Sequence, residues 1–216
     1  MLGGGNANAN LSFAEGDARD KATLDRAFAQ HDIDAVVCTT GTTAFPSKRW
    51  EGNNGPRPTD LDGNLNLINA CPRSLKRFIF VTSAGVERQK EFPWLVLNLY
   101  GVLTFKRAAE IALEESGLPW TVLRPSRLVD GPYTSFDLNT LLKATSESQG
   151  LRGVDLKQGD CFKGQASRVA VAEACVQALQ SEKAEGRAFA IESVAAGAGP
   201  GADEAAWRVM FERAAA

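Results

Sequence analysis

Three runs of hydroxyl-bearing and glycine residues each follow an apolar segment of the sequence. They are residues 39–42 (Thr-Thr-Gly-Thr), the pair Thr82-Ser83, and Ser126 after an Arg-Pro step. If the apolar segments are parallel strands, their carboxyl ends meet at one edge of a sheet, where such folds bind ligands. Hydroxyls and glycine N–H groups there can approach a phosphate or a ribose closely. Ordinary strand-to-helix turns also use these residues, but three successive turns of this kind favour a ligand cleft.

Lys106 is a further candidate for chemistry. It lies among Leu103, Phe105 and Ala109 in a segment with helical periodicity. Its amine could hydrogen-bond a ligand, or its stem could cover apolar surface while the ammonium reaches solvent. The residues alone favour these two interpretations equally.

The remaining reactive side chains do not favour metal or triad chemistry. Cys38, Cys71, Cys161 and Cys175 form no C-x-x-C pair, and His31 is the single histidine. Cys38 and Cys175 lie inside apolar runs, which predicts buried free thiols, as in a reducing compartment. We therefore expect no metal site and no Ser-His-Asp triad.

Length and composition predict one globular domain over residues 11–216. The chain has 216 residues, of which 44% are apolar and 23% charged, and its formal net charge is -2. That balance argues against a nucleic-acid-binding surface. No stretch reaches the ~20 apolar residues of a membrane span. Residues 1–10 have neither signal-peptide nor transit-peptide character, and we expect a flexible terminus there.

The elements that would position the candidate groups alternate along the chain. Expected strands are residues 11–15, 33–38, 77–82, 120–124 and 188–193. The first expected helix begins at Asp20, which would be its N-cap. Further helices are expected at residues 59–71, 97–116, 137–145, 168–181 and 203–215. A long loop at residues 46–58 has Trp50 as a candidate exposed side chain. The alternation predicts an α/β fold with a doubly wound parallel sheet, Rossmann-like, covered on both faces.

Five motifs occur in an order that is typical of a known family. They are Gly16-Asp17, Asp60-x-x-Gly63-x-x-Asn66, residues 80–86 (FVTSAGV), Lys106-x-x-x-Glu110, and residues 116–126 (SGLPWTVLRPS). With them the sequence resembles the atypical short-chain dehydrogenases/reductases, from about Leu11 to the C-terminus. It is most similar to NmrA-like, NAD(P)-binding plastid proteins of plants and algae. Residues 38–54 and 128–142 are similar to one uncharacterised plastid branch. The resemblance implies NADP or NAD as the cofactor and a chloroplast location.

The resemblance also implies site roles. Asp17 would face the adenine, and Thr40 and Gly41, with Thr39 beside them, would lie along the adenosine ribose and pyrophosphate. Thr82 and Ser83 would lie near the nicotinamide ribose, and Lys106 would hydrogen-bond that ribose. Pro125 and Ser126 would flank the nicotinamide.

One departure from the family concerns catalysis. Such dehydrogenases use Tyr-x-x-x-Lys, but Val102 stands four residues before Lys106. Tyr100 is six residues before it, on a different face of the expected helix. The usual serine position falls at Ala84 rather than Ser83. Lys106, Ser83 and Tyr100 remain the catalytic candidates, and losing a positioned general acid costs about 10²–10⁴ in rate.

A second departure concerns the start of the domain. The family's first β-α-β unit, with its glycine-rich loop, takes ~30 residues or more, but only ten precede Leu11. Residues 3–5 (Gly-Gly-Gly) lack the strand before and the helix after that such a loop needs. We expect cofactor binding to be weakened or lost, and an unpaired apolar edge on the strand at residues 33–38, which favours self-association.

Three explanations for the short start remain open: an incompletely predicted gene, an alternative product, or a genuine short protein whose first strand pairs directly with residues 33–38.

Two functions fit these observations. One is an NAD(P)H-dependent reductase of a small organic substrate, with Tyr100, Tyr133, Lys106 and Arg127 as available proton donors or carbonyl polarisers. The other is a non-catalytic plastid scaffold, redox-sensing or assembly factor that binds a protein partner. The residues that would choose between NAD and NADP follow the strand that is absent.

Overall fold

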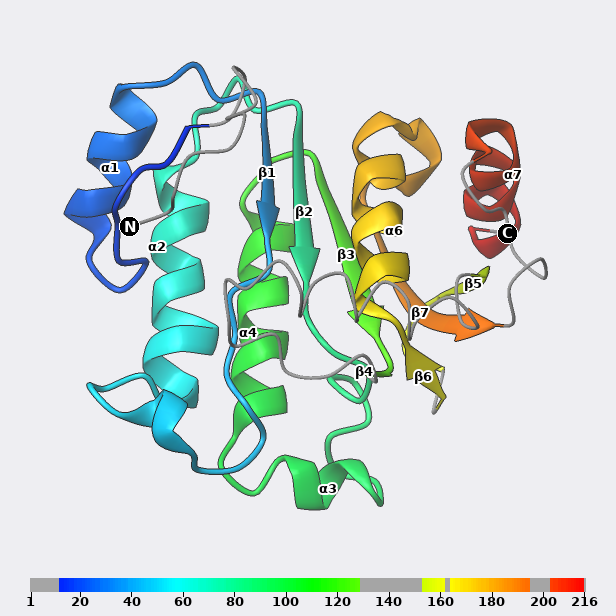
Figure 1. The fold of residues 1–216 in the computed structure, drawn as a ribbon, viewed down its shortest axis with the longest axis horizontal. Helices are drawn as coiled ribbons and strands as arrows, with labels where there is room; N and C mark the ends of the chain where they lie inside the picture. The colour runs from blue at the N-terminus through cyan, green and yellow to red at the C-terminus, as the bar shows by residue number, and fades with distance from the viewer. Residues whose placement is uncertain (1–11, 129–152, 162–163, 195–202, 216) are drawn as a thin grey trace, which may run out of the picture.

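The computed structural model describes residues 12–128, 153–161, 164–194 and 203–215. These residues form a five-stranded sheet in the order β1-β2-β3-β7-β5 and a two-stranded ribbon of β4 and β6 (Figure 1). The strands are β1 (Ala35–Cys38), β2 (Arg77–Val81), β3 (Trp120–Pro125), β4 (Arg127–Leu128), β5 (Gly153–Gln158), β6 (Gln165–Ala166) and β7 (Arg187–Val194). Strands β1, β2, β3 and β7 are parallel to one another, and β5 lies antiparallel to β7.

Helices lie on both faces of the sheet. They are α1 (Lys21–Ala29), α2 (Gly63–Ala70), α3 (Trp94–Leu97), α4 (Val102–Glu115), α6 (Arg168–Gln180) and α7 (Glu204–Ala214), with short helical turns η1 (Lys48–Trp50), η2 (Arg57–Asp62) and η4 (Glu182–Ala184). In Figure 1, α1, α2 and α4 lie on one side of the strands, and α6 and α7 on the other.

Alternating residues of β2 supply two separate cores. Phe78 and Phe80 pack with Leu113 of α4, whereas Ile79 packs with Trp207 of α7. All of these side chains are buried. A strand that is apolar on both faces in this way is typical of a parallel sheet between two helical layers. The predicted doubly wound α/β sheet is confirmed.

Most of the helix predictions are also confirmed. Asp20 caps α1, because its carboxylate accepts the Ala22 N–H at 3.1 Å. The predicted helix at residues 59–71 corresponds to η2 followed directly by α2, with Ile68 5% exposed on the inner face. Asp203 caps α7, which buries Trp207 and Phe211.

The predicted strand at residues 11–15 is wrong for the part that the structure describes. Residues 12–17 have no strand conformation, and Phe13 is 80% exposed. No described residue pairs with the free side of β1, so direct pairing of residues 11–15 with β1 does not occur either. An isolated extended segment gains no ladder hydrogen bonds, and short apolar alternation alone does not stabilise it.

The free side of β1 is an apolar edge, as the sequence predicted. Val37 is 44% exposed there, and no charged residue or proline interrupts the strand. Edges of this kind favour pairing with another chain. Self-association of the protein stays a prediction.

The long helix predicted at residues 97–116 is divided in two. The short α3 ends at Leu97, and α4 begins only at Val102, after Gly101 with a φ of 78°. Asn98 makes the break, since its side-chain oxygen accepts the N–H groups of Leu103 and Thr104 at 2.9 and 3.1 Å. Tyr100 therefore lies in a turn before α4, and its predicted angle around the helix relative to Lys106 does not apply.

Several predicted features lie outside the described residues: the helix at residues 137–145, Tyr133, the linker at residues 197–201, and the glycine run at residues 3–5. Strand β5 was not expected from the sequence. Of the helices that the structure describes, none is both long and apolar enough to cross a membrane.

Gly85, after β2, offers a test of the packing at this end of the sheet. Its φ is 92°, and a Cβ there would clash with the Trp94 ring. Gly85→Ala should cost about 1–2 kcal/mol for the left-handed backbone and about 1–3 kcal/mol more for overpacking. Gly117→Ala, at a φ of 75° with only Arg73 near its Cβ position, should cost the first amount alone. Urea unfolding of both variants measures the difference, and equal losses would contradict the packing of Trp94 on Gly85.

Candidate functional site

The three polar turns follow neighbouring strands and lie at one edge of the sheet. Thr82 donates its N–H to Leu123 of β3 at 2.9 Å, and Ala84 donates to Pro125 at 3.0 Å. Ser126 in turn donates its N–H to Ile191 of β7 at 2.9 Å. These bonds continue the ladders beyond the regular strands, so the loops after β2 and β3 run together. The prediction that the turns share one edge is confirmed.

Lys106 of α4 is buried against this edge and is not a surface lysine. The residue is 8% exposed, and its Nζ lies 2.5 Å from Oδ1 of Asp60 in η2, which is fully buried. The alternative in which the ammonium reaches solvent is therefore wrong. A buried ammonium is tolerated because a carboxylate meets it directly.

The loop after β1 closes around this ion pair. The N–H of Thr42 donates to Asp60 Oδ1 at 3.1 Å, and the Thr42 hydroxyl donates to Oδ2. Gly41 lies against the pair, because a Cβ on it would clash with Lys106 Nζ and lie 3.0 Å from Asp60 Oδ1. A side chain at this position would require the Lys106 ammonium to shift away from its present place beside the backbone.

A second buried carboxylate is that of Glu110, which lies one helical turn after Lys106 on α4. It accepts the Thr82 hydroxyl at 2.5 Å and Arg124 at 3.2 and 2.8 Å, and Arg107 lies 3.1 Å away. Burial acts to lower the pKa of Arg124, but the hydrogen bonds and charge of Glu110, helped by Glu87, outweigh it and raise that pKa above its ordinary value. The network joins α4 to the ends of β2 and β3.

Asp160, just after β5, fixes the loop that follows β2. Its carboxylate accepts the N–H of Gly85 at 2.9 Å and of Glu87 at 3.0 Å, and it pairs with Arg88 at 2.9 Å. The Arg88 guanidinium lies over the Trp94 ring at 5.1 Å. No role was expected for Asp60, Glu110 or Asp160, although the first two stand in the family motifs.

The end of β3 presents a hydroxyl without a partner. Ser126 is 4% exposed, and its Oγ makes no hydrogen bond to any residue that the structure describes. Pro125 before it is the last residue of β3. A buried hydroxyl without a partner is costly and is the kind of group that a polar ligand satisfies. Ser83, by contrast, donates its hydroxyl to the Ala84 carbonyl at 2.9 Å.

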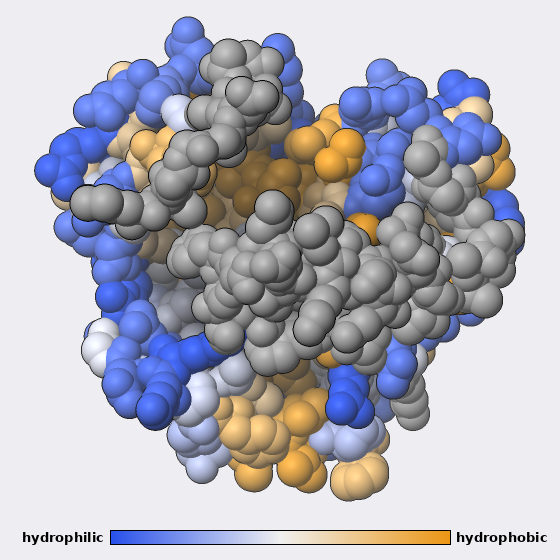
Figure 2. Space-filling view, in the orientation of Figure 1, coloured by the Kyte–Doolittle hydropathy of each residue, from blue (hydrophilic) through white to orange (hydrophobic). Residues whose placement is uncertain are grey.

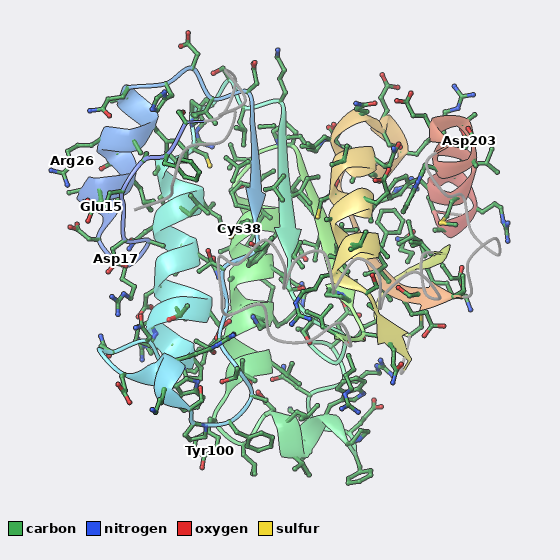
Figure 3. All side chains as sticks on the ribbon, viewed as in Figure 1. Glu15, Asp17, Arg26, Cys38, Tyr100 and Asp203 are labelled. Carbon is green, nitrogen blue, oxygen red and sulfur yellow. The ribbon has the colours of Figure 1, made fainter. Side chains whose placement is uncertain are left out.

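Two of the predicted site residues have other contacts. Asp17 lies in the turn before α1, beside that helix in Figure 3. Arg19 binds its carboxylate and lowers the pKa of Asp17 to about 2. Tyr100 is 49% exposed and packs edge-on against Trp50 and Phe45. Trp50, expected to be exposed, is thus half-buried.

The buried thiols were predicted correctly for Cys38 and Cys175, and all four cysteines are free. Burial raises the pKa of Cys38, an effect that hydrogen bonding to Thr40 opposes only in part. Burial also raises the pKa of Cys71 to about 12 and that of Cys175 to about 11. Thr39, beside Cys38, is exposed.

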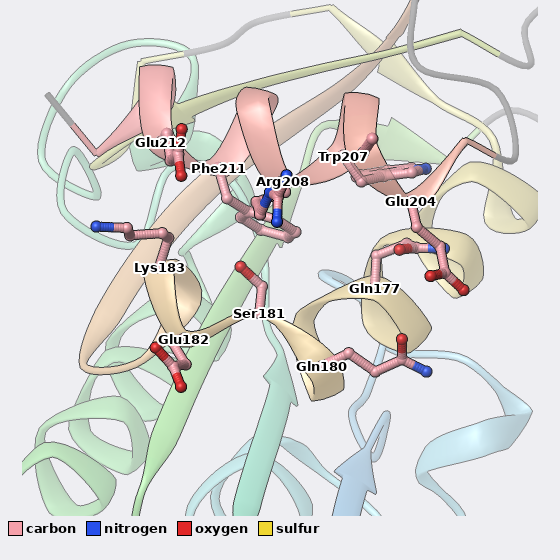
Figure 4. Close-up of a pocket in the computed structure, with 11 residues that line it drawn as sticks. Gln177, Gln180, Ser181, Glu182, Lys183, Glu204, Trp207, Arg208, Phe211 and Glu212 are labelled. Carbon is pink, nitrogen blue, oxygen red and sulfur yellow. The ribbon is translucent and has the colours of Figure 1, made fainter.

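A cavity of about 590 Å³ lies elsewhere, between the end of α6, η4 and α7 (Figure 4). Ser181, Glu182 and Lys183 in its wall precede the amino end of β7. It therefore opens at the edge of the sheet opposite to the polar turns. Its wall mixes acidic and basic side chains around Trp207 and Phe211, and we assign it no part in the site.

A mostly parallel sheet with helices on both faces and polar turns at its carboxyl edge defines a nucleotide-binding α/β protein of the Rossmann type. A sequence profile described as NAD(P)H-binding matches residues 5–182. The chain belongs to this NAD(P)H-binding family.

Its relatives include plant proteins named as chloroplastic. The chain is 31% identical over 174 residues to the chloroplastic protein TIC 62 of Pisum sativum, covering 79% of this chain and 29% of that protein. It is 29% identical over 197 residues to an uncharacterised chloroplastic protein of Arabidopsis thaliana, covering 85% and 56%. It is 28% identical over 172 residues to sanguinarine reductase of Eschscholzia californica, covering 76% and 56%. The chain thus spans between about a third and a little over half of these relatives.

Solved structures confirm the fold. The oxidoreductase ylbE of Lactococcus lactis superposes with a TM-score of 0.66 at 17% identity, covering 96% of this chain and 79% of that one. A short-chain dehydrogenase/reductase of Veillonella parvula, solved with NADP, superposes with a TM-score of 0.53 at 20% identity, covering 82% and 70%. Neither of these superpositions identifies cofactor-binding residues in this chain.

The residues at the carboxyl edge fit part of a dinucleotide. The Ser126 hydroxyl lacks a partner, and Gly41 leaves backbone accessible beside an ammonium. The part of the chain that the structure describes contains no glycine-rich turn between a strand and a helix N-terminus, which is the usual pyrophosphate site. These groups therefore fit a polyhydroxylated ligand such as a nucleotide ribose.

Glu110→Gln tests the network at the ends of β2 and β3. The variant keeps the shape of the side chain but leaves Arg124, 1% exposed, without its buried counter-charge. We expect a loss of about 3–5 kcal/mol in the free energy of unfolding, measured by chemical denaturation. The control is Glu114→Gln, which removes a carboxylate that also pairs with Arg107 but is 30% exposed. It should cost less than about 1 kcal/mol, and a similar loss in both variants would contradict the role of burial.

Proposed function

We propose that this chain is the NAD(P)H-binding domain of a plastid reductase that acts on a small organic substrate. The observation that carries the proposal is the Lys106 ammonium held beside the Gly41 backbone at the carboxyl end of β1. A charged donor and a side-chain-free backbone together suit a ribose hydroxyl. Membership of the NAD(P)H-binding family supports the nucleotide, and the relative named sanguinarine reductase supports the reaction class.

Different residues at the carboxyl edge of the sheet would bind different parts of the cofactor. Lys106 would donate to the nicotinamide ribose, and Ser126, with Pro125 before it, would flank the nicotinamide. The Thr82 hydroxyl donates to Glu110, so its oxygen is left to accept from the ribose. Ser83 would lie beside it. When bound, the cofactor supplies a hydride to the substrate.

The adenosine side would be held less firmly. Thr39, Thr40 and Gly41 would line the pyrophosphate and ribose through backbone N–H groups. Asp17, engaged by Arg19, would reach the adenine only if that ion pair rearranged. We therefore expect weak binding of NADP or NAD by this chain.

The proton for the reduced substrate would not come from a tyrosine one turn before Lys106. Val102 occupies that position and is 3% exposed. Tyr100 is the candidate donor, because the turn before α4 leaves its side chain half exposed at the same end of the molecule. Its hydroxyl would act at the rim of the site, where water also has access.

A second candidate function is that of a non-catalytic binding protein. The segment around α3 exposes large apolar side chains: Phe92 is 81% exposed, Leu99 68% and Leu95 54%. Figure 2 shows apolar atoms gathered over α3, on the lower side of the view. Exposed apolar patches often mark a binding surface. If the chain neither binds NADPH nor oxidises it with a panel of quinones and enones, this function is favoured.

Ser126→Ala separates cofactor binding from folding. Because the Ser126 hydroxyl has no partner in the described part of the chain, its removal should leave the free energy of unfolding unchanged or slightly higher. The dissociation constant for NADPH, measured by calorimetry, should rise by about two- to tenfold, the loss of one hydrogen bond.

Ser181→Ala is the matched control. The Ser181 hydroxyl is also buried without a partner, but it lies at the opposite edge of the sheet. Its removal should leave NADPH affinity unchanged. Equal affinities for wild type, Ser126→Ala and Ser181→Ala would count against the cofactor site at the end of β3.

A further inference from the structure

Asp60 is the least exposed member of the cluster at the end of β1. The residue is fully buried, and its two carboxylate oxygens accept from the Lys106 ammonium and from the backbone and hydroxyl of Thr42. Thus one charged and two neutral donors meet a single carboxylate. The contacts join η2, α4 and the loop after β1 at one point.

The backbone around Asp60 is held independently of Lys106. The Asn64 side chain donates to the Asp60 carbonyl at 3.0 Å and accepts from the Cys38 thiol at 3.3 Å. Asn64 is 1% exposed, and Cys38 is 3% exposed at the tip of β1. This arrangement fixes the carboxylate relative to the strand, whereas the long Lys106 side chain has four rotatable bonds and no other hydrogen-bond partner among the described residues. The rigid group of the pair is the aspartate.

We propose that Asp60 is the positioning residue for Lys106: its carboxylate holds the ammonium against Gly41, where it faces a cofactor ribose. The identity of the ligand, a cofactor ribose, rests on the proposed function, whereas the contact between Asp60 and Lys106 does not. Without the carboxylate, the lysine would be a buried charge without a partner and would leave the Gly41 backbone for solvent. Asp60 thereby sets where Lys106 donates without itself touching the cofactor.

The first arm of the test follows the Lys106 amine directly. Acetic anhydride labelling, read by peptide mass spectrometry, compares Lys106 with Lys76, whose side chain is 75% exposed. In the wild type, Lys106 should react much more slowly than Lys76. In Asp60→Asn it should react about tenfold faster than in the wild type, because a hydrogen bond to a charged partner is lost. Asp62→Asn, in the same helical turn but 49% exposed, should not change its rate.

A destabilised control distinguishes positioning from general loosening. Glu110→Gln removes a buried carboxylate one turn along α4 and leaves the Asp60 contact intact. All labelling is done at a temperature where circular dichroism shows every variant folded. Lys106 should be labelled faster in Asp60→Asn but not in Glu110→Gln. No acceleration in Asp60→Asn, or the same acceleration in both, would overturn the proposal.

The second arm uses NADPH. Lys106→Met should weaken binding about tenfold, by the loss of a charged donor, and Asp60→Asn should weaken it to a similar degree. The double variant should bind no worse than Lys106→Met alone, because Asp60 acts through the lysine. Additive losses would overturn the positioning role. If the wild type itself binds no NADPH, the proposed function fails, and the labelling arm still decides the role of Asp60.

Discussion

Two buried ion pairs on one helix hold together the carboxyl edge of the sheet. Lys106 and Glu110 are four residues apart on α4, so they lie on the same face of the helix. One reaches Asp60 beside β1, and the other reaches Arg124 and Thr82 at the ends of β3 and β2. Each charge would be costly alone and is stable only with its partner. All of these buried charges are therefore paired only when α4 and the three strand ends take this one arrangement.

This arrangement also sets the chemical character of the edge. Each buried charge of α4 is met by an opposite one, so the edge presents a paired ammonium, glycine backbone and hydroxyls. Ser126, whose hydroxyl is unsatisfied within the protein, lies at the same edge. A surface of this kind suits a polyhydroxylated ligand better than a free phosphate, in keeping with membership of the NAD(P)H-binding family.

The loops beyond the strands are fastened by polar groups and not by a continuous apolar core. Asp160 accepts two backbone N–H groups of the loop after β2 and pairs with Arg88. Gly85 in that loop packs under Trp94, and α3 beyond it exposes Leu95 and Val96. The side of the molecule that carries the candidate site is thus closely hydrogen-bonded at the strand ends and more exposed around α3. At the lateral edge of the same sheet, β1 has no strand partner on its free side among the described residues.

The sequence by itself determined the four parallel strands, most of the helices, the cap at Asp20, and the strand ends that share one edge. Hydrophobic periodicity and capping act over a few residues, so a local pattern is enough to predict them. Tertiary structure alone decided which charges meet: Asp60 is 46 positions from Lys106, and Asp160 is 75 from Gly85. It also decided that the apolar run before Gly101 breaks instead of continuing α4, since the Asn98 cap depends on how the two segments pack. Burial and pairing of charges depend on contacts distant in the sequence, and these exist only once the strands and helices have assembled.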